Sequence, residues 1–217
     1  MDEKYVQEMS VKRRIRTQAL AILQRANRAG IPIKWQRIGA PVFSKLLCEK
    51  YHNKIEDMVK FVYDTPLELK KKSFVVIDGG TDTERYQIGF AILFRLIACD
   101  SIGKYVSGKD ICHQLESIKL NRSEIANELK TYDTLFIGEI TKNSLNTHFD
   151  GGSFLDEILE FRKMYDKLTI ISFQEPLSPY LEYQLDPVVY GNYLSSIYAS
   201  EKNKSQNILR IHAKVEE

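Results

Sequence analysis

The sequence predicts a three-layer α/β domain with a five-stranded parallel sheet, preceded by a helical N-terminal segment. The first observation is the run 74–77 (FVVI), which is continuously apolar, rich in β-branched residues and followed by Asp78-Gly79-Gly80. A parallel strand covered on both faces has this pattern. The second observation is that such runs alternate with segments of helical periodicity, which is typical of a parallel sheet with helices on both faces.

Each expected element has a local signal. The N-terminal helix has an apolar stripe with spacings of three and four, and Gly30 followed by Pro32 ends it. The stripe consists of Ile15, Ala19, Ile22, Leu23 and Ala26. Further helices are expected at about 41–63, 85–99, 110–118, 121–130 and 153–165, with Asn121 and Glu124 resembling a capping box. Further strands are expected at 105–107, 135–137, 168–172 and 208–213.

Composition limits the class of protein. The chain has 217 residues, 43% of them hydrophobic and 28% charged, so it can bury a core without cross-links and is not of a disordered or fibrous class. Its three cysteines are not a disulfide framework. No apolar run is long enough for a membrane span, and the first residues are not a signal peptide. We therefore expect a soluble, cytoplasmic protein.

Charge is distributed unevenly along the chain. Between Met9 and Arg37 there are eight basic residues and no acidic one, so of the net charge of +2 this segment holds +8 and the rest −6. Such a cluster predicts contact with a polyanion or an acidic partner. The residues expected to make it are Lys12, Arg13, Arg14, Arg16, Arg25, Arg28 and Trp35. Trp35 could stack on bases or pack against the core.

The turn after the first expected strand has the order of a phosphate-binding loop with substituted positions. Such a loop needs G-x-x-x-x-G-K-[ST], and Gly79 holds its first position. Glu84 stands in place of the second glycine, Arg85 in place of the lysine and Tyr86 in place of the hydroxyl residue. If nucleotide binds here, we expect Gly79, Gly80, Thr83, Arg85 and Gln174 to contact it. The alternative is an ordinary strand-to-helix turn, in which glycine supplies the backbone angles.

Two more strand ends carry substituted site residues. A nucleotide hydrolase has an aspartate for magnesium after its Walker B strand, and here Gly138 stands there, followed by Glu139. Glu139 is the one candidate catalytic residue. Gln174 could sense a γ-phosphate, or could hydrogen-bond within its own loop.

In their order and spacing these segments resemble the DnaC/DnaI class of bacterial replicative-helicase loaders, which are AAA+ proteins, and the related IstB-type transposition ATPases. The matching segments are 29–35, 74–80, 105–110, 133–140 and 155–172. The resemblance implies an AAA+ P-loop core at 67–217, preceded by a basic helical segment at 1–66. It also implies that Arg162, at or next to the loaders' "R-Y" arginine, acts in trans on a neighbouring subunit's nucleotide.

Four departures accompany this resemblance. The Walker lysine, the Walker hydroxyl and the Walker B aspartate are missing, and residues 188–193 lack the sensor-2 arginine of the loaders. We therefore expect a pseudo-ATPase that binds the replicative helicase or its loader and single-stranded DNA, with ATP and magnesium disfavoured as cofactors. A phage or another mobile element is the expected origin. Two alternatives stay open. One is an active ATPase that uses Arg85 and Glu139, and the other is a loader-mimicking inhibitor that does not bind DNA.

The cysteines and histidines do not predict a metal site. Three residues lie between Cys48 and His52, and Cys112 adjoins His113, whereas zinc sites need four ligands in paired spacings. We expect core thiols and ordinary histidines, and no metal.

Overall fold

A computed structural model describes residues 3–36, 69, 72–79, 81–116, 122–141, 151–173 and 208–213, and the structural statements below concern these residues. The expected helix at 41–63, the segment 179–199 and the sensor-2 region lie outside them. The predicted class, a mixed α/β chain with a parallel sheet, is confirmed.

The described strands form one sheet in the order β2-β3-β4-β1-β5, and each neighbouring pair is parallel. Its strands are β1 (Phe74–Gly79), β2 (Gly103–Ser107), β3 (Thr134–Ile140), β4 (Leu168–Phe173) and β5 (Ile208–Ala213). Every strand predicted from an apolar run is present, some of them longer by one to four residues. The order places β4 between β1 and β3, two strands that are far apart in the sequence.

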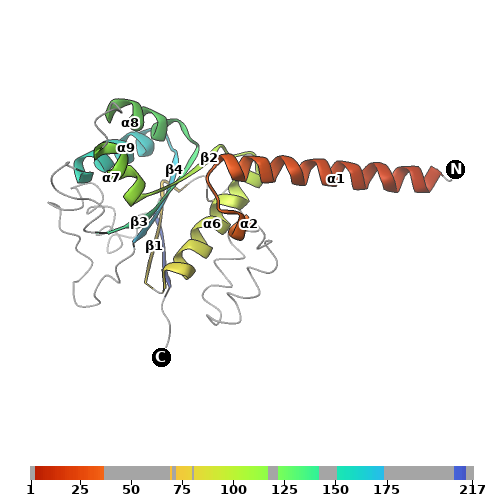
Figure 1. Ribbon diagram of the computed structural model, residues 1–217, viewed down its shortest axis with the longest axis horizontal. Coiled ribbons are helices and arrows are strands. Elements are labelled where there is room, and N and C mark those ends of the chain that lie inside the picture. The colour runs from red at the N-terminus through yellow and green to blue at the C-terminus, as the bar shows by residue number, and fades with distance from the viewer. Residues whose placement is uncertain are drawn as a thin grey trace.

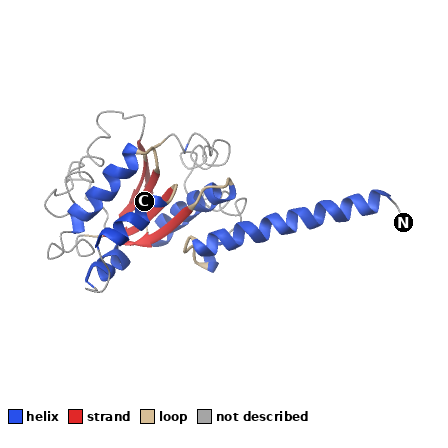
Figure 2. Ribbon diagram, turned by 90° about the horizontal axis from the view of Figure 1, so that it is seen from above, coloured by secondary structure: helices blue, strands red, loops and turns tan. Residues whose placement is uncertain are grey.

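Helices cover both faces of the sheet (Figures 1 and 2). They are α1 (Glu3–Arg28), α2 (Ile33–Gln36), α6 (Asp82–Ala98), α7 (Gly108–Glu116), α8 (Arg122–Thr131) and α9 (Gly151–Met164). Alternate residues of β1 enter different cores: Val75 and Ile77 pack with α6 and the end of α1, whereas Phe74 and Val76 pack with α7, α8 and α9. This alternation explains why the strand is apolar on both faces.

The C-terminal end of α1 is fixed to the body. Ala26, Ala29 and Ile31 are buried, and the backbone N–H of Tyr105 in the edge strand β2 donates to the carbonyl oxygen of Ala29 at 2.7 Å. The helix ends where predicted, at Gly30, whose φ of +80° favours glycine.

The rest of α1 extends away from the body (Figures 1 and 2). Of the predicted apolar stripe, Ala26 is buried and Ile22 half-buried, but Ile15, Ala19 and Leu23 are exposed. Within this stripe, only the residues in the last two turns of α1 contact the core. None of the described helices combines the length and apolar character that crossing a membrane requires.

Candidate functional site

The carboxyl ends of β1, β3 and β4 meet at one edge of the sheet, where open α/β sheets bind their ligands. A small hollow lies there, lined by Asp82, Arg85, Tyr86, Glu139 and Ser172. Its volume is about 10 Å³, roughly the space that one water molecule needs. Arg85 and Tyr86, from the first turns of α6, therefore lie beside Glu139, from the end of β3.

Two backbone N–H groups at the start of α6 are bound by side chains of the same segment. Gly79 has a φ of +71°, and the loop leads into α6 through a capping box formed by Thr81 and Glu84. The Glu84 carboxylate accepts from the backbone N–H of Thr81 at 2.8 Å, and the Thr81 hydroxyl accepts from the backbone N–H of Glu84. Glu84 is only 4% exposed. A carboxylate of the chain thus lies at the helix N-terminus, where a phosphate would otherwise find donors and a favourable dipole.

Arg85, which replaces the Walker lysine, points back into this loop. Its side chain is buried, donates to the carbonyl oxygen of Gly79 at 2.6 Å and pairs with the carboxylate of Asp82. The positive charge of Arg85 is therefore compensated by acceptors within the same segment of the chain. Helix α6 begins at Asp82 and not at Arg85 as predicted, because the capping box starts it one turn earlier.

The Gly138 position, which replaces the Walker B aspartate, is filled by aromatic rings. A β-carbon added there would lie 2.9 Å from Cε2 of Tyr105 and 3.4 Å from Cε1 of Tyr86. Such distances leave no room for a carboxylate unless these rings move. Tyr86 is the residue that the sequence pattern aligns with the hydroxyl position of a phosphate-binding loop.

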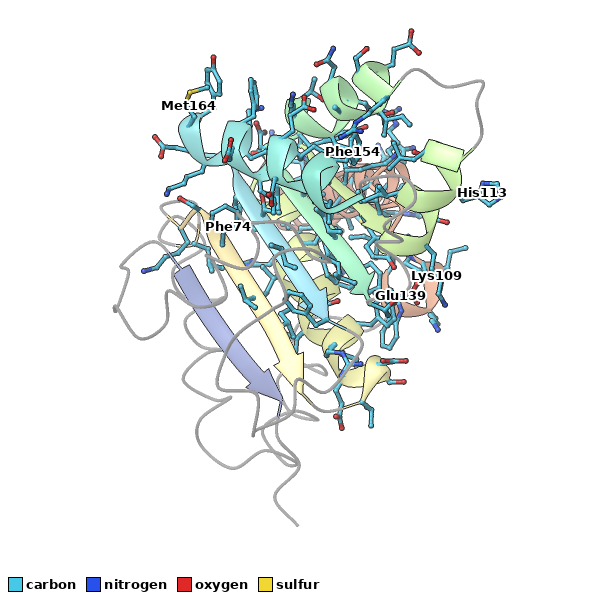
Figure 3. The ribbon with its side chains drawn as sticks, turned by 90° about the vertical axis from the view of Figure 1, so that its left-hand side faces the viewer. Phe74, Lys109, His113, Glu139, Phe154 and Met164 are labelled. Carbon is cyan, nitrogen blue, oxygen red and sulfur yellow. The ribbon has the colours of Figure 1, made fainter. Side chains whose placement is uncertain are left out.

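Glu139 is held by a short hydrogen-bond chain. The hydroxyl of Tyr105 donates to that of Tyr86 at 3.2 Å, and the hydroxyl of Tyr86 bonds to Glu139. Burial raises the pKa of Tyr86, as does this bond to the carboxylate, and burial raises the pKa of Tyr105 to about 12. Both phenols are therefore neutral donors at physiological pH. Figure 3 shows Glu139 at the carboxyl end of β3, where it adopts a φ of +56° and the register with β4 shifts.

Trp35 belongs to the same aromatic cluster. Its ring stacks on Phe90 with centroids 6.1 Å apart, and Phe90 stacks on Tyr86 with centroids 5.6 Å apart. Phe90 also meets Tyr105 edge to face. Trp35 therefore packs against the core, which is one of the two alternatives that the sequence left open.

Arg162 is the clearest correction to the sequence prediction. It is fully buried, and all three guanidinium nitrogens donate inside the domain. Its acceptors are the Thr169 hydroxyl and the carbonyl oxygens of Leu129, Tyr132, Asp133 and Leu168. Burial lowers its pKa to about 10, against the opposing effect of Asp133. A side chain enclosed in this way does not reach a neighbouring subunit, which contradicts the expected role in trans.

The other predicted site residues are distributed as follows. Thr83 is exposed on the first turn of α6, and Gly80 and Gln174 lie outside the described residues. The basic residues Lys12, Arg13, Arg14, Arg16 and Arg28 are exposed on α1. Arg25 instead pairs with Asp100 at 2.6 Å and helps to fix the helix to the body.

The described residues contain no group of three or more histidine, cysteine or acidic side chains that could hold a metal ion. Cys48 and His52 lie outside them, and the side chain of Cys112 is not described.

Sequence reasoning missed the contribution of Tyr105 and Glu84. The signal for Glu84 was present, because T-x-x-E at 81–84 is a capping-box pattern. Tyr105 had no local signal, since its contact with Gly138 joins two residues that are 33 positions apart in the chain.

Comparison with known proteins gives no match: no protein-family model matches this chain, and no curated protein is similar to it.

Proposed function

We propose that this protein is a helicase-loader-like accessory protein of DNA replication, with an AAA+-type P-loop core that acts as a pseudo-ATPase. It binds the replicative helicase or its loader, together with single-stranded DNA, and the partner supplies the ATP hydrolysis. In this proposal, a phage or another mobile element encodes the protein.

The observation that carries this proposal is the meeting of the substituted Walker positions at one edge of the sheet. Arg85 belongs to the helix that follows β1, whereas Gly138 and Glu139 belong to β3, and β4 lies between these two strands. In AAA+ domains one strand likewise separates the phosphate-loop strand from the Walker B strand. The strand order therefore supports the resemblance that the motifs suggest.

The contacts in the site support the proposal that this chain does not hydrolyse ATP. A magnesium-bound triphosphate needs a cation for its phosphates and a carboxylate for the metal. Here Arg85 is engaged by Gly79 and Asp82, Glu84 places negative charge at the helix N-terminus, and aromatic rings fill the space at Gly138. The described residues of this site do not fit magnesium and ATP in this arrangement.

The first test is ATP turnover by the purified chain. We expect phosphate release no faster than that of the Glu139→Gln variant, because Tyr86 already holds Glu139. Turnover that is lost in both Arg85→Ala and Glu139→Gln would instead establish the active-ATPase alternative.

The second test identifies the partner. The tagged full chain is incubated with host lysate, and co-purifying proteins are identified by mass spectrometry. Recovery of the replicative helicase or its loader is the expected result. Recovery of the helicase without any DNA binding by the purified chain would favour the inhibitor alternative, and recovery of a transposase alone would overturn the loader assignment.

A further inference from the structure

We propose that the projecting part of α1 is a binding arm for duplex nucleic acid, which inserts into the major groove with cations facing both phosphate backbones. This goes beyond the proposed function, which requires only single-stranded DNA.

The cations on the arm are available for a ligand. Lys12, Arg13, Arg14 and Arg16 are exposed, and none of them is in an ion pair with another described side chain. The sequence has no acidic residue between Met9 and Arg37, and the nearest carboxylate, Glu8, is within one turn of Lys12 alone among these four. The arm also stands clear of the body in two perpendicular views (Figures 1 and 2).

Their positions around the helix suit a groove with two charged walls. Residues two apart in an α-helix lie about 200° apart around its axis. Arg14 is therefore on the flank opposite Lys12 and Arg16, and Arg13 lies between the two flanks. A helix with its side chains is about 10–12 Å across, and the major groove of duplex DNA is about 12 Å wide. A helix lying in that groove would have cations directed at both backbones.

The apolar residues are compatible with this placement. Val11, Ile15 and Ile22 lie on the side of the helix opposite Arg13, and would face out of the groove. They continue the line of Ala26, the residue through which α1 packs on the body. The exposed Met9 and Leu20 lie near Arg13 and would face into the groove, where the methyl groups of thymine accept apolar contacts.

Two other occupants fit less well. A second copy of the arm would bring its own cluster of cations against this one, and like charges repel. A flat acidic protein surface would contact one flank and leave the other unpaired.

Because the C-terminal end of α1 is anchored, the arm has a fixed position relative to the body of the protein. Arg25 pairs with Asp100, and the carbonyl oxygen of Ala29 accepts from Tyr105 in the edge strand. From Arg14 to Ala26 the helix rises by about 18 Å. A bound duplex would therefore lie at a defined distance from the sheet.

The test measures the affinity of the purified full chain for a labelled DNA duplex and for one of its strands, across a salt series. Four phosphate contacts predict a slope of log K against log salt of about −3.6 for the duplex, which is about a 150-fold loss of affinity between about 50 and about 200 mM salt. Two single variants test the two flanks separately: Arg14→Gln on one flank and Arg16→Gln on the other. Each should reduce the magnitude of this slope by about 0.9. Glutamine is a good helix former, so circular dichroism should be unchanged.

Lys163→Gln, at an exposed cation on α9, is the matched control and should leave the slope unchanged. The proposal is overturned if the duplex does not bind at about 50 mM salt, if the single strand binds as tightly as the duplex, or if only one flank contributes. Because no helicase is present in this assay, its failure leaves the partner experiment above unaffected.

Discussion

The ring of Tyr105 lies against the α-carbon of Gly138, so closely that a β-carbon at residue 138 would be 2.9 Å from Cε2 of the ring. The two residues come from neighbouring parallel strands, β2 and β3. This contact places an aromatic ring beside the residue that the proposed resemblance aligns with the Walker B aspartate. The hydroxyl group of Tyr105 also donates a hydrogen bond to that of Tyr86, which in turn is hydrogen-bonded to Glu139.

We expect Gly138→Ala to lower the free energy of unfolding by about 1–3 kcal/mol, because the added methyl group overpacks the rings. The backbone at this position is not in the left-handed region, so the cost is steric. Urea denaturation measures it. In the Tyr105→Ala background the same substitution should cost less. An equal cost in both backgrounds would show that the ring is not the obstacle.

Arg162→Ala should be among the most destabilising single substitutions, at about 3–5 kcal/mol, because it opens a cavity and leaves several buried carbonyl oxygens without a donor. Arg162→Lys should recover only part of this loss, since an ammonium group does not have the planar fork that reaches all of these acceptors. The neighbouring exposed Lys163→Ala is the control, with an expected change within about 0.5 kcal/mol. A stable Arg162→Ala protein would contradict the structural role assigned here.

Gly89→Ala should also destabilise the protein, although alanine in an exposed helix stabilises by about 1 kcal/mol relative to glycine. A β-carbon at residue 89 would lie 2.2 Å from Cζ of the buried Phe136, so overpacking outweighs helix propensity. Thermal unfolding monitored by circular dichroism checks the sign. The companion substitution Phe136→Leu shortens the ring, and should make Gly89→Ala less costly than it is alone. A rise in melting temperature for Gly89→Ala alone would disprove the close contact.

Stability should fall as pH rises above about 10, where an ordinary tyrosine ionises. Tyr105 has a pKa of about 12 in the folded protein, and burial raises that of Tyr86 as well. The folded state therefore keeps these protons while the unfolded state loses them, so the stabilising effect is complete below pH 10 and is lost as the pH rises through the folded pKa values. Urea denaturation from about pH 8 to about pH 11 measures the effect.

Tyr105→Phe is the control for this pH dependence, because phenylalanine keeps the ring and removes the ionising hydroxyl. The fall in stability above pH 10 should be shallower in this variant. An identical fall in both proteins would mean that other groups cause it.

Local patterns in the sequence predicted most of the described fold. The run at 168–172 matches β4 because a strand covered on both faces must be apolar throughout, and that property is visible in a few consecutive residues. The end of α1 at Gly30 was predictable for the same reason, since glycine ends a helix through its own backbone angles. The meeting of Arg85 and Glu139 at one edge followed from their places at strand ends.

The sequence by itself thus determined the class of fold, the strand ends that make the site, and the basic character of α1. Only the tertiary structure decided what individual side chains do there. Arg162 is enclosed because β4 and the segment before β3 converge on it, and Tyr105 fills the space at Gly138 because β2 pairs with β3 in one particular register. Both outcomes depend on contacts between residues far apart in the chain, and local residue patterns do not contain that information.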